Sequence, residues 1–455
     1  MKEEAIAIFD IGKTNKKLLL FDMNLRPVSE WEEKFATVQD EDGFECDNID
    51  NIEKWIRDSV SGLISSDKYH LKAVNFTTYG ASLAYLDGQG KRLTPVYNYL
   101  KTLDENIPSE LYGKYGGKDE FCRRTASPAL GMLNSGIQAL WLKKTRPDLF
   151  SRVRTILHLP QYLSYMLTGV LCSEHTSIGC HTAIWDFDNM MYHHWVKDEE
   201  LPFPDPVPVT TLFNCTMKGK SFYTGTGLHD SSSSLAPYFK VTAGNFILMS
   251  TGTWCISMNP FNNELLTGEQ LSRDCLCYMS VNREPVKSSR FFLGQMHDTA
   301  VRNMSSYFKI HENSFMLVKP DAKLMNKLMN KFMKEKVFAE LDENIIHFNE
   351  NPDLFVFDNF IEAYHLLMVE LSDIAVSSVN LIVPDNDQVE NIFITGGFSK
   401  NLLFLKLIAS SFPDKKVWTS EIGNATALGA AAVMLSAIYP ENLVTPDLGL
   451  NEVKL

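Results

Sequence analysis

The feature that most constrains the fold is one short pattern that occurs twice, once in each half of the chain. Residues 5–9 form an apolar run, residues 10–17 form a turn rich in small and polar side chains, and residues 18–21 form a second apolar run. The same order of strand, small-residue turn and strand returns at residues 245–258. Such runs around a turn predict β-hairpins. The repetition predicts two domains of similar plan, covering residues 1–240 and 241–455.

Strand and helix patterns alternate through the rest of the chain, which indicates an α/β fold. Helices are predicted over residues 48–63, 136–167 (with breaks at its prolines), 357–381 and 424–436. The apolar runs 82–86 and 95–99 flank the turn Asp87-Gly88-Gln89-Gly90 and predict a further hairpin. Ser399 is predicted to cap a helix that ends near Phe412.

Composition narrows the function. The 455 residues carry a formal net charge of −13, from 43 basic and 56 acidic side chains, and no basic block interrupts it. This excludes nucleic acid and anionic membranes as expected partners. No stretch approaches the ~18 apolar residues of a membrane span, and the first residues lack the pattern of a secretory signal. We therefore expect a cytoplasmic protein that acts on small molecules, with a homodimer as the one assembly considered.

The eight cysteines are scattered, which fits a reducing compartment. Cys172, His175, Cys180 and His181 lie close together in the sequence. Their spacing matches no standard zinc pattern, so no metal is predicted there.

The first candidate site is the turn from Asp10 to Lys17. Gly12 allows close approach to the backbone, the hydroxyl and amides can hold phosphate oxygens, and the carboxylate can hold Mg²⁺ through water. An ordinary polar hairpin explains the segment as well. A P-loop is excluded because the glycine that it needs is Ala7, and the missing GxGxxG excludes a Rossmann-type dehydrogenase.

Three further segments carry suitable chemistry. The turn around Thr253 offers hydroxyls and free backbone, or is a buried hairpin. Asp230 precedes four serines and either accepts a proton from an alcohol or caps a helix. The pair Gly396-Gly397 and the small-residue segment 423–429 suit a flat base lying against backbone, or tight helix packing.

In this order the segments resemble the FGGY group of carbohydrate kinases, within the actin-like ATPase superfamily, over about residues 6–435. Thr77-Thr78-Tyr79-Gly80, His229-Asp230 and Gly252-Thr253-Trp254 resemble the L-fuculokinase and rhamnulokinase branch. The resemblance implies two actin-like, ribonuclease H-like domains with a nucleotide and sugar cleft between them. It also implies transfer of phosphate from ATP to a small ketose such as L-fuculose or L-rhamnulose.

The resemblance assigns roles to single residues. Asp230 is implied as the general base, with Gly80 and His229 also at the sugar, and Asp10 as the holder of hydrated Mg²⁺. The nucleotide is implied to contact Lys13, Thr14, Asn15, Lys17, Thr253, Gly396 and Gly397.

Some positions depart from that pattern. Ser82 stands where these kinases usually carry an aspartate, Lys13 stands where a small residue is usual, and residues 291–297 match no expected contact. Two alternatives therefore stay open. One is a kinase for another sugar, such as xylulose or a polyol. The other is a non-catalytic or weakly active nucleotide-binding regulator on the same fold.

Overall fold

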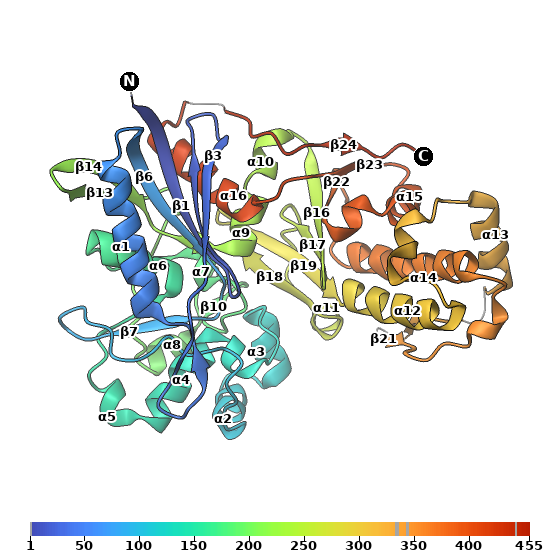
Figure 1. Cartoon of the computed structure of the whole chain (residues 1–455). Coiled ribbons are helices and arrows are strands. Elements are labelled where there is room, and N and C mark those ends of the chain that lie inside the picture. The colour runs from blue at the N-terminus through green and yellow to red at the C-terminus, as the bar shows by residue number, and fades with distance from the viewer. Residues whose placement is uncertain (1, 333–335, 343–344, 442–443) are drawn as a thin grey trace.

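The computed structural model describes residues 2–332, 336–342, 345–441 and 444–455. It forms two lobes, each built around a mixed sheet, with the chain passing from the first lobe to the second near β16 (Asn245–Thr251) (Figure 1).

The first sheet has the strand order β13-β14-β6-β1-β2-β3. The strands are β1 (Glu3–Ile11), β2 (Lys16–Phe21), β3 (Pro27–Glu33), β6 (Tyr69–Thr78), β13 (Leu212–Met217) and β14 (Lys220–Gly225). β1 pairs antiparallel with β2 and parallel with β6. The short β15 (Leu228–His229) pairs in parallel with the end of β6, where His229 lies opposite Thr78. This pairing brings the residues before Asp230 to the carboxyl end of the sheet.

The second sheet repeats this arrangement, in the order β18-β19-β17-β16-β22-β23-β24. Besides β16, its strands are β17 (Cys255–Asn259), β18 (Cys275–Met279), β19 (Pro285–Phe291), β22 (Val389–Gly396), β23 (Lys416–Thr419) and β24 (Asn451–Glu452). The hairpin β16–β17 has β22 in parallel beside it, as β1–β2 has β6. The predicted α/β fold with two similar halves is confirmed.

Helices cover the faces of both sheets. In α1, Asn48 caps the first turn by accepting from the backbone N–H of Asn51, and the buried Ile52, Ile56 and Val60 pack toward the first sheet. The longer helices are α1 (Ile49–Ser65), α4 (Ser135–Thr145), α6 (Leu159–Thr168), α12 (Leu293–Phe308), α13 (Ala322–Lys331), α14 (Phe360–Asn380), α15 (Leu402–Ser411) and α16 (Ala425–Ile438). The shorter ones include α2 (Asn106–Lys114), α3 (Lys118–Arg124), α5 (Pro147–Phe150), α7 (His175–Ile178), α8 (His194–Asp198), α9 (Asp230–Leu235), α10 (Tyr238–Val241) and α11 (Gly268–Ser272).

Helix α16 joins the two lobes. It comes from the last part of the chain, yet it packs against α9, β1 and β6 of the first lobe (Figure 1). One apolar cluster contains Ile6 and Ile8 of the first sheet, Met434 of α16, and Phe246 and Leu248 of the second sheet. The two cores are therefore continuous through this helix.

The approach of α16 to α9 depends on Gly429. A Cβ at this position would lie 1.7 Å from the backbone oxygen of Ser233. The two helix backbones are thus in direct contact, which is typical of small-residue interfaces.

Three predicted details are wrong. The predicted helix 136–167 is interrupted by a strand at residues 155–158. Residues 95–99 form no strand; β7 (Leu83–Leu86) pairs instead with the distant β8 (Thr155–His158). Pro95 lacks a backbone N–H to donate to a ladder, and β8 is a fully buried strand with Ile156 and Leu157 at its centre. Ser399 does not cap the following helix. Asn401 caps α15, accepting from the N–H groups of Leu403 and Phe404.

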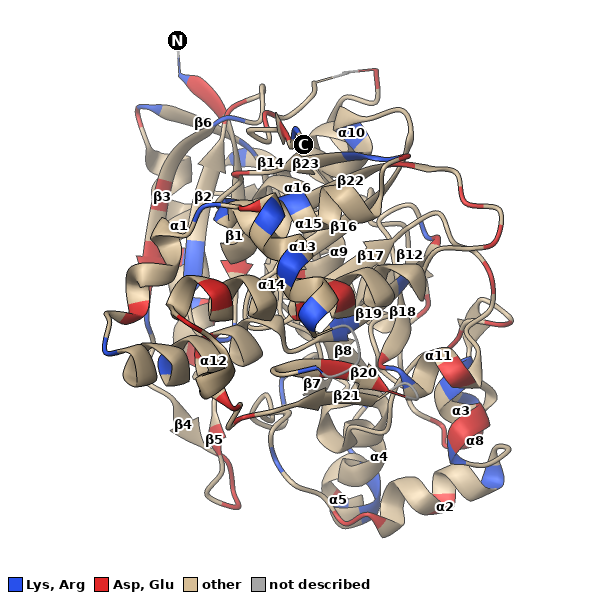
Figure 2. Ribbon diagram, turned by 90° about the vertical axis from the view of Figure 1, so that its right-hand side faces the viewer, with Lys and Arg blue, Asp and Glu red and all other residues tan. Residues whose placement is uncertain are grey.

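Charged residues of both signs are interspersed over the elements of the two lobes (Figure 2). Within the residues that the structure describes, no helix combines the length and apolarity needed to cross a bilayer.

Candidate active site

Asp230 begins α9 at the carboxyl end of the first sheet. Helix α6 holds the segment that leads to it. Gln161 Nε2 donates to the backbone oxygen of Gly227 at 2.9 Å, and Ser164 Oγ donates to that of Gly225 at 2.6 Å. The position of Asp230 is therefore set by strand pairing on one side and by a buried helix on the other.

The carboxyl of Asp230 is largely buried but remains accessible to a ligand. Burial raises its pKa to about 6, while the backbone N–H of Ser231, 2.6 Å from Oδ1, works in the opposite direction. Its side chain keeps 33% of its surface exposed, so a ligand hydroxyl can reach it. At neutral pH the group is ionised, with a pKa suited to accepting a proton.

His229 lies beside this carboxyl. Its Nε2 is 3.1 Å from Asp230 Oδ1 and 3.1 Å from Cys180 Sγ. Burial lowers the pKa of His229 to about 4, so the ring is neutral at physiological pH. A neutral imidazole can orient the carboxylate without neutralising its charge.

Gly80 closes the other side of His229. A Cβ at Gly80 would lie 3.1 Å from His229 Nε2, closer than side chains normally approach. Next to them is a small interior cavity lined by Ser82, His158, Ser177 and His229, among others. Within the described part of the chain, Ser82 Oγ, Ser177 Oγ, His158 Nδ1 and His229 Nδ1 have no hydrogen-bond partner of normal geometry. The position where an aspartate was expected is thus a buried hydroxyl beside this polar cavity.

Asp10, at the end of β1, approaches the same cleft from the first hairpin. Its Oδ2 accepts a hydrogen bond from Thr426 Oγ1 at 2.5 Å, across 416 residues of sequence. Burial raises the pKa of Asp10 to about 6, and the nearby charge of Asp230 raises it further. When both are ionised, the two negative carboxylates in one cleft attract cations.

A pocket of about 320 Å³ lies between the lobes at this point. It is lined from both halves of the chain, by Asp230, Ser231, Ser234, Tyr238, Leu248, Ser250, Thr395, Gly396, Ile422, Gly423, Ala425 and Thr426. Hydroxyls and glycine backbone dominate its polar part. Such a lining suits a phosphate chain and a flat base.

The predicted residues of the first turn lie in three different surroundings. Thr14 and Asn15 are exposed at the tip. Lys17 pairs with Glu30 at 2.8 Å and donates to Asn424 Oδ1 at 3.2 Å, so it lies where the lobes meet. Lys13 instead points to Asp47, 3.0 Å away, with its ammonium over the ring of Tyr79.

The turn of the second hairpin leaves Thr253 exposed. Gly396 has φ +88°, and a Cβ there would lie 1.8 Å from the backbone oxygen of Thr251, so only glycine fits. Gly396 lines the cleft pocket, whereas Gly397 and Thr253 do not. Of the predicted residues, Asp230 and Gly396 thus line one pocket, His229 lies beside Asp230 and Gly80, and the charges of Asp230 and Lys17 act on Asp10.

Sequence reasoning missed the cluster around Asp47. Its carboxylate accepts from Lys16 at 2.7 Å, Lys13 at 3.0 Å and the Tyr79 hydroxyl at 2.6 Å. Burial alone raises the pKa of Asp47, but these hydrogen bonds bring it below its usual value. The signal that was available is Lys16, a lysine on the same face of its strand as the apolar Leu18 and Leu20.

The cysteine and histidine cluster holds no metal site. Among the described residues, no group of three or more His, Cys, Asp or Glu side chains is arranged to hold a metal ion. Cys180 is instead a buried thiol beside His229.

Comparison with curated proteins finds rhamnulokinases. The rhamnulokinase of Yersinia pestis (strain Pestoides F) is 26% identical over 267 residues, which are 54% of this chain and 52% of that protein. The rhamnulokinase of Yersinia pseudotuberculosis serotype I (strain IP32953) matches with the same values. The match spans about half the length of these curated relatives.

Solved structures share the fold along the whole chain. A carbohydrate kinase from Novosphingobium aromaticivorans superposes with a TM-score of 0.82 at 23% identity, covering 100% of this chain and 95% of that one. A ligand-bound xylulose kinase from Lactobacillus acidophilus gives 0.74 at 15% identity, covering 99% and 93%. Plasmodium falciparum glycerol kinase with ADP gives 0.68 at 15% identity, covering 98% and 93%.

Two family profiles match in succession. Residues 5–197 match the N-terminal domain of the FGGY family of carbohydrate kinases, and residues 243–442 match the carbohydrate kinase FGGY C-terminal domain. Since the two matches together take in most of the chain and agree with the shared fold, the protein belongs to the FGGY family of carbohydrate kinases.

Proposed function

We propose that this protein transfers the γ-phosphoryl group of ATP to a hydroxyl of a small ketose such as L-fuculose or L-rhamnulose. The observation that carries the proposal is the carboxyl of Asp230. It has a raised pKa and an accessible surface, and it stands between Gly80 and His229 on one side and the cleft pocket on the other. That is where a base between a sugar and a nucleotide belongs.

Transfer of a phosphoryl group asks for positioning and charge stabilisation rather than covalent help from the protein. In our proposal Asp230 accepts the proton of the sugar hydroxyl. The backbone N–H of Ser231 and the neutral ring of His229 hold the carboxylate in place. Closure of the two lobes excludes water that would otherwise take the phosphoryl group.

The residues present fit ATP and Mg²⁺. The cleft pocket offers hydroxyls and glycine backbone to a nucleotide, with Thr14, Asn15, Lys17, Thr253 and Gly397 proposed as contacts from the flanking turns. Asp10 would hold a hydrated Mg²⁺, because its carboxyl lies in the cleft within reach of the charge of Asp230, and two neighbouring carboxylates favour a cation. When bound, that ion neutralises phosphate charge. In this structure Lys13 is engaged by Asp47, so its proposed role toward the nucleotide requires it to leave that pair.

The choice of a ketose rests on the curated relatives, which are named rhamnulokinases. Proteins of the same fold are named xylulose kinase, gluconate kinase and glycerol kinase. A kinase for xylulose or a polyol is therefore the second candidate. The non-catalytic regulator is the third.

The test is ADP release with Mg-ATP across a panel of L- and D-ketoses, polyols and gluconate. Strong stimulation by L-fuculose or L-rhamnulose is expected. Stimulation by another sugar would keep the kinase and change the substrate. ATP binding without stimulation by any sugar would favour the regulator.

The matched variant is Asp230→Asn, which keeps the shape of the side chain and removes the base. We expect turnover to fall by ~10²–10⁴ while nucleotide affinity stays within about twofold. Asp67→Asn is the control, because it is the same substitution at a fully exposed aspartate that does not line the cleft pocket. Full activity of Asp230→Asn would place the base elsewhere.

A further inference from the structure

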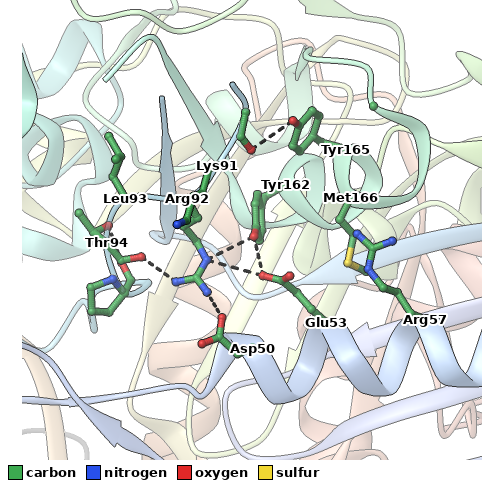
Figure 3. A pocket seen from close by; sticks show the side chains of 13 residues that line it. Asp50, Glu53, Arg57, Lys91, Arg92, Leu93, Thr94, Tyr162, Tyr165 and Met166 are labelled. Carbon is green, nitrogen blue, oxygen red and sulfur yellow. Dashed lines mark hydrogen bonds and ion pairs between the residues drawn. The ribbon is translucent and has the colours of Figure 1, made fainter. Parts of the chain in front are cut away.

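A second pocket, larger than the cleft pocket, lies in the first lobe. It has a volume of about 660 Å³ and is bounded by α1, by the segment 90–95 after β7, and by α6 (Figure 3). None of its lining residues lines the cleft pocket or the cavity beside His229. It is therefore a separate site on the described surface.

One side of this pocket is a closed network of paired charges. Arg92 forms an ion pair with Asp50 and donates to the backbone oxygen of Thr94 at 2.7 Å. Tyr162 donates to Glu53 at 2.5 Å and accepts from Arg92 Nε at 3.2 Å (Figure 3). These contacts leave the charge of Arg92 balanced within the wall of the pocket.

Two other cations are not balanced in this way. Arg57, on α1, and Lys91, in the turn after β7, are exposed and line the pocket. In the described chain, neither side chain forms a hydrogen bond or an ion pair. Asp87, in the same turn as Lys91, accepts backbone hydrogen bonds and feels the lysine charge without pairing with it. The free charge that the pocket offers to a ligand is therefore positive.

The pocket also offers acceptors for hydroxyl groups. Asp50 keeps 83% of its side chain exposed although it pairs with Arg92, and the carbonyl of Gly90 is reached by the Tyr165 hydroxyl at 3.2 Å. The volume lies within the range of small-molecule sites. A ligand that satisfies both features has an anionic group for the free cations and hydroxyls for the carboxylate and carbonyl oxygens.

We propose that this pocket is a second binding site, for a small phosphorylated sugar or polyol, with its phosphate held by Arg57 or Lys91. Charged hydrogen bonds to phosphate are the strong contacts of such sites. The inference concerns binding alone, so it stands apart from the proposed kinase activity.

The experiment is hydrogen–deuterium exchange of the full chain, without ATP, with three probes: inorganic phosphate, a ketohexose 1-phosphate and the unphosphorylated ketohexose. We expect the ketohexose 1-phosphate to protect peptides covering residues 50–57 and 88–95. Inorganic phosphate should protect them more weakly, and the neutral sugar not at all. Peptides around residues 227–234 report separately on binding in the cleft.

The variant is the double substitution Arg57→Ala with Lys91→Ala. Protection of residues 50–57 and 88–95 should then require at least tenfold more ligand, while protection at 227–234 is unchanged. Lys54→Ala is the matched control, because Lys54 is an exposed cation of the same helix that pairs with Asp58 and does not line the pocket. Both cations are exposed, so the fold is not at risk.

Three results would overturn the proposal. They are no protection of these peptides by the ketohexose 1-phosphate, equal protection by the neutral sugar, and equal protection in the double variant. Since no step requires turnover, an enzyme inactive toward every sugar would leave this test intact.

Discussion

At the scale of single residues, the pKa of Asp230 predicts where the pH–rate profile falls on its acid side. A protonated carboxyl cannot accept a proton, so kcat/KM should fall about tenfold per pH unit below about pH 6. The measurement is the pH dependence of kcat/KM for the best sugar of the panel. A limb near pH 4 would indicate a base with the pKa of an exposed carboxylate.

This measurement needs a control for folding, because the buried histidines affect the stability of the fold in the same pH range. Burial lowers the pKa of His158 to about 3 and that of His229 to about 4. Because the unfolded chain binds these protons first, the stability that these two neutral histidines contribute is lost as pH falls below about 6.5. Circular dichroism at each pH separates the loss of the base from loss of the fold.

Gly80 allows a second prediction at this scale. In Gly80→Ala the new Cβ would lie 3.1 Å from His229 Nε2, so the imidazole must move by a few tenths of an ångström. Because His229 contacts Asp230, we expect kcat/KM to fall on the order of tenfold with little change in nucleotide affinity. Gly113→Ala, where nothing lies within 4 Å of the new Cβ, should leave kcat/KM unchanged. Wild-type kcat/KM in Gly80→Ala would argue against a role for this contact.

At the scale of elements, the contact between α16 and α9 is the most sensitive. Gly429→Ala would place a Cβ 1.7 Å from the backbone oxygen of Ser233, which forces the helices apart. We expect the free energy of unfolding to fall by about 1–3 kcal/mol or more. Urea denaturation measures this change in the free energy of unfolding.

Gly62→Ala is the reference for this change, since it is also a helix glycine replaced by alanine. Nothing lies within 4 Å of its new Cβ, so stability should rise by about 0.5–1 kcal/mol. Equal effects of the two substitutions would mean that the α16–α9 contact carries no strain.

Sequence reasoning was most successful in predicting individual helices and hairpins. The two hairpins and the helices α1, α14 and α16 follow from local patterns of apolar and polar residues, and local patterns suffice for them. The pairing of β7 could not be found in this way. Its partner β8 lies some 70 residues away, and no sequence pattern near β7 indicates this pairing.

At the scale of the whole molecule, the site depends on contacts that no local pattern encodes. The order of motifs pointed to Asp10 and Asp230 through a family resemblance. The hydrogen bond from Thr426 to Asp10 and the ion pairs of Asp47 join segments that are distant in sequence. Lys13 was assigned to the nucleotide through the same resemblance, and only the structure shows that its neighbours in space are Asp47 and Tyr79.

The position of α16 has a consequence for how the protein is made. The apolar face of β1 and β6 is covered by α16, a helix that is synthesised long after these strands. The first half of a nascent chain therefore waits, with Ile6 and Ile8 uncovered, until α16 has been synthesised. We predict that residues 1–240 expressed alone bind a hydrophobic dye and unfold without a cooperative transition. The full chain should bind no such dye and should unfold cooperatively. A cooperative, monomeric fragment would mean that the first lobe finishes folding before its last helix arrives.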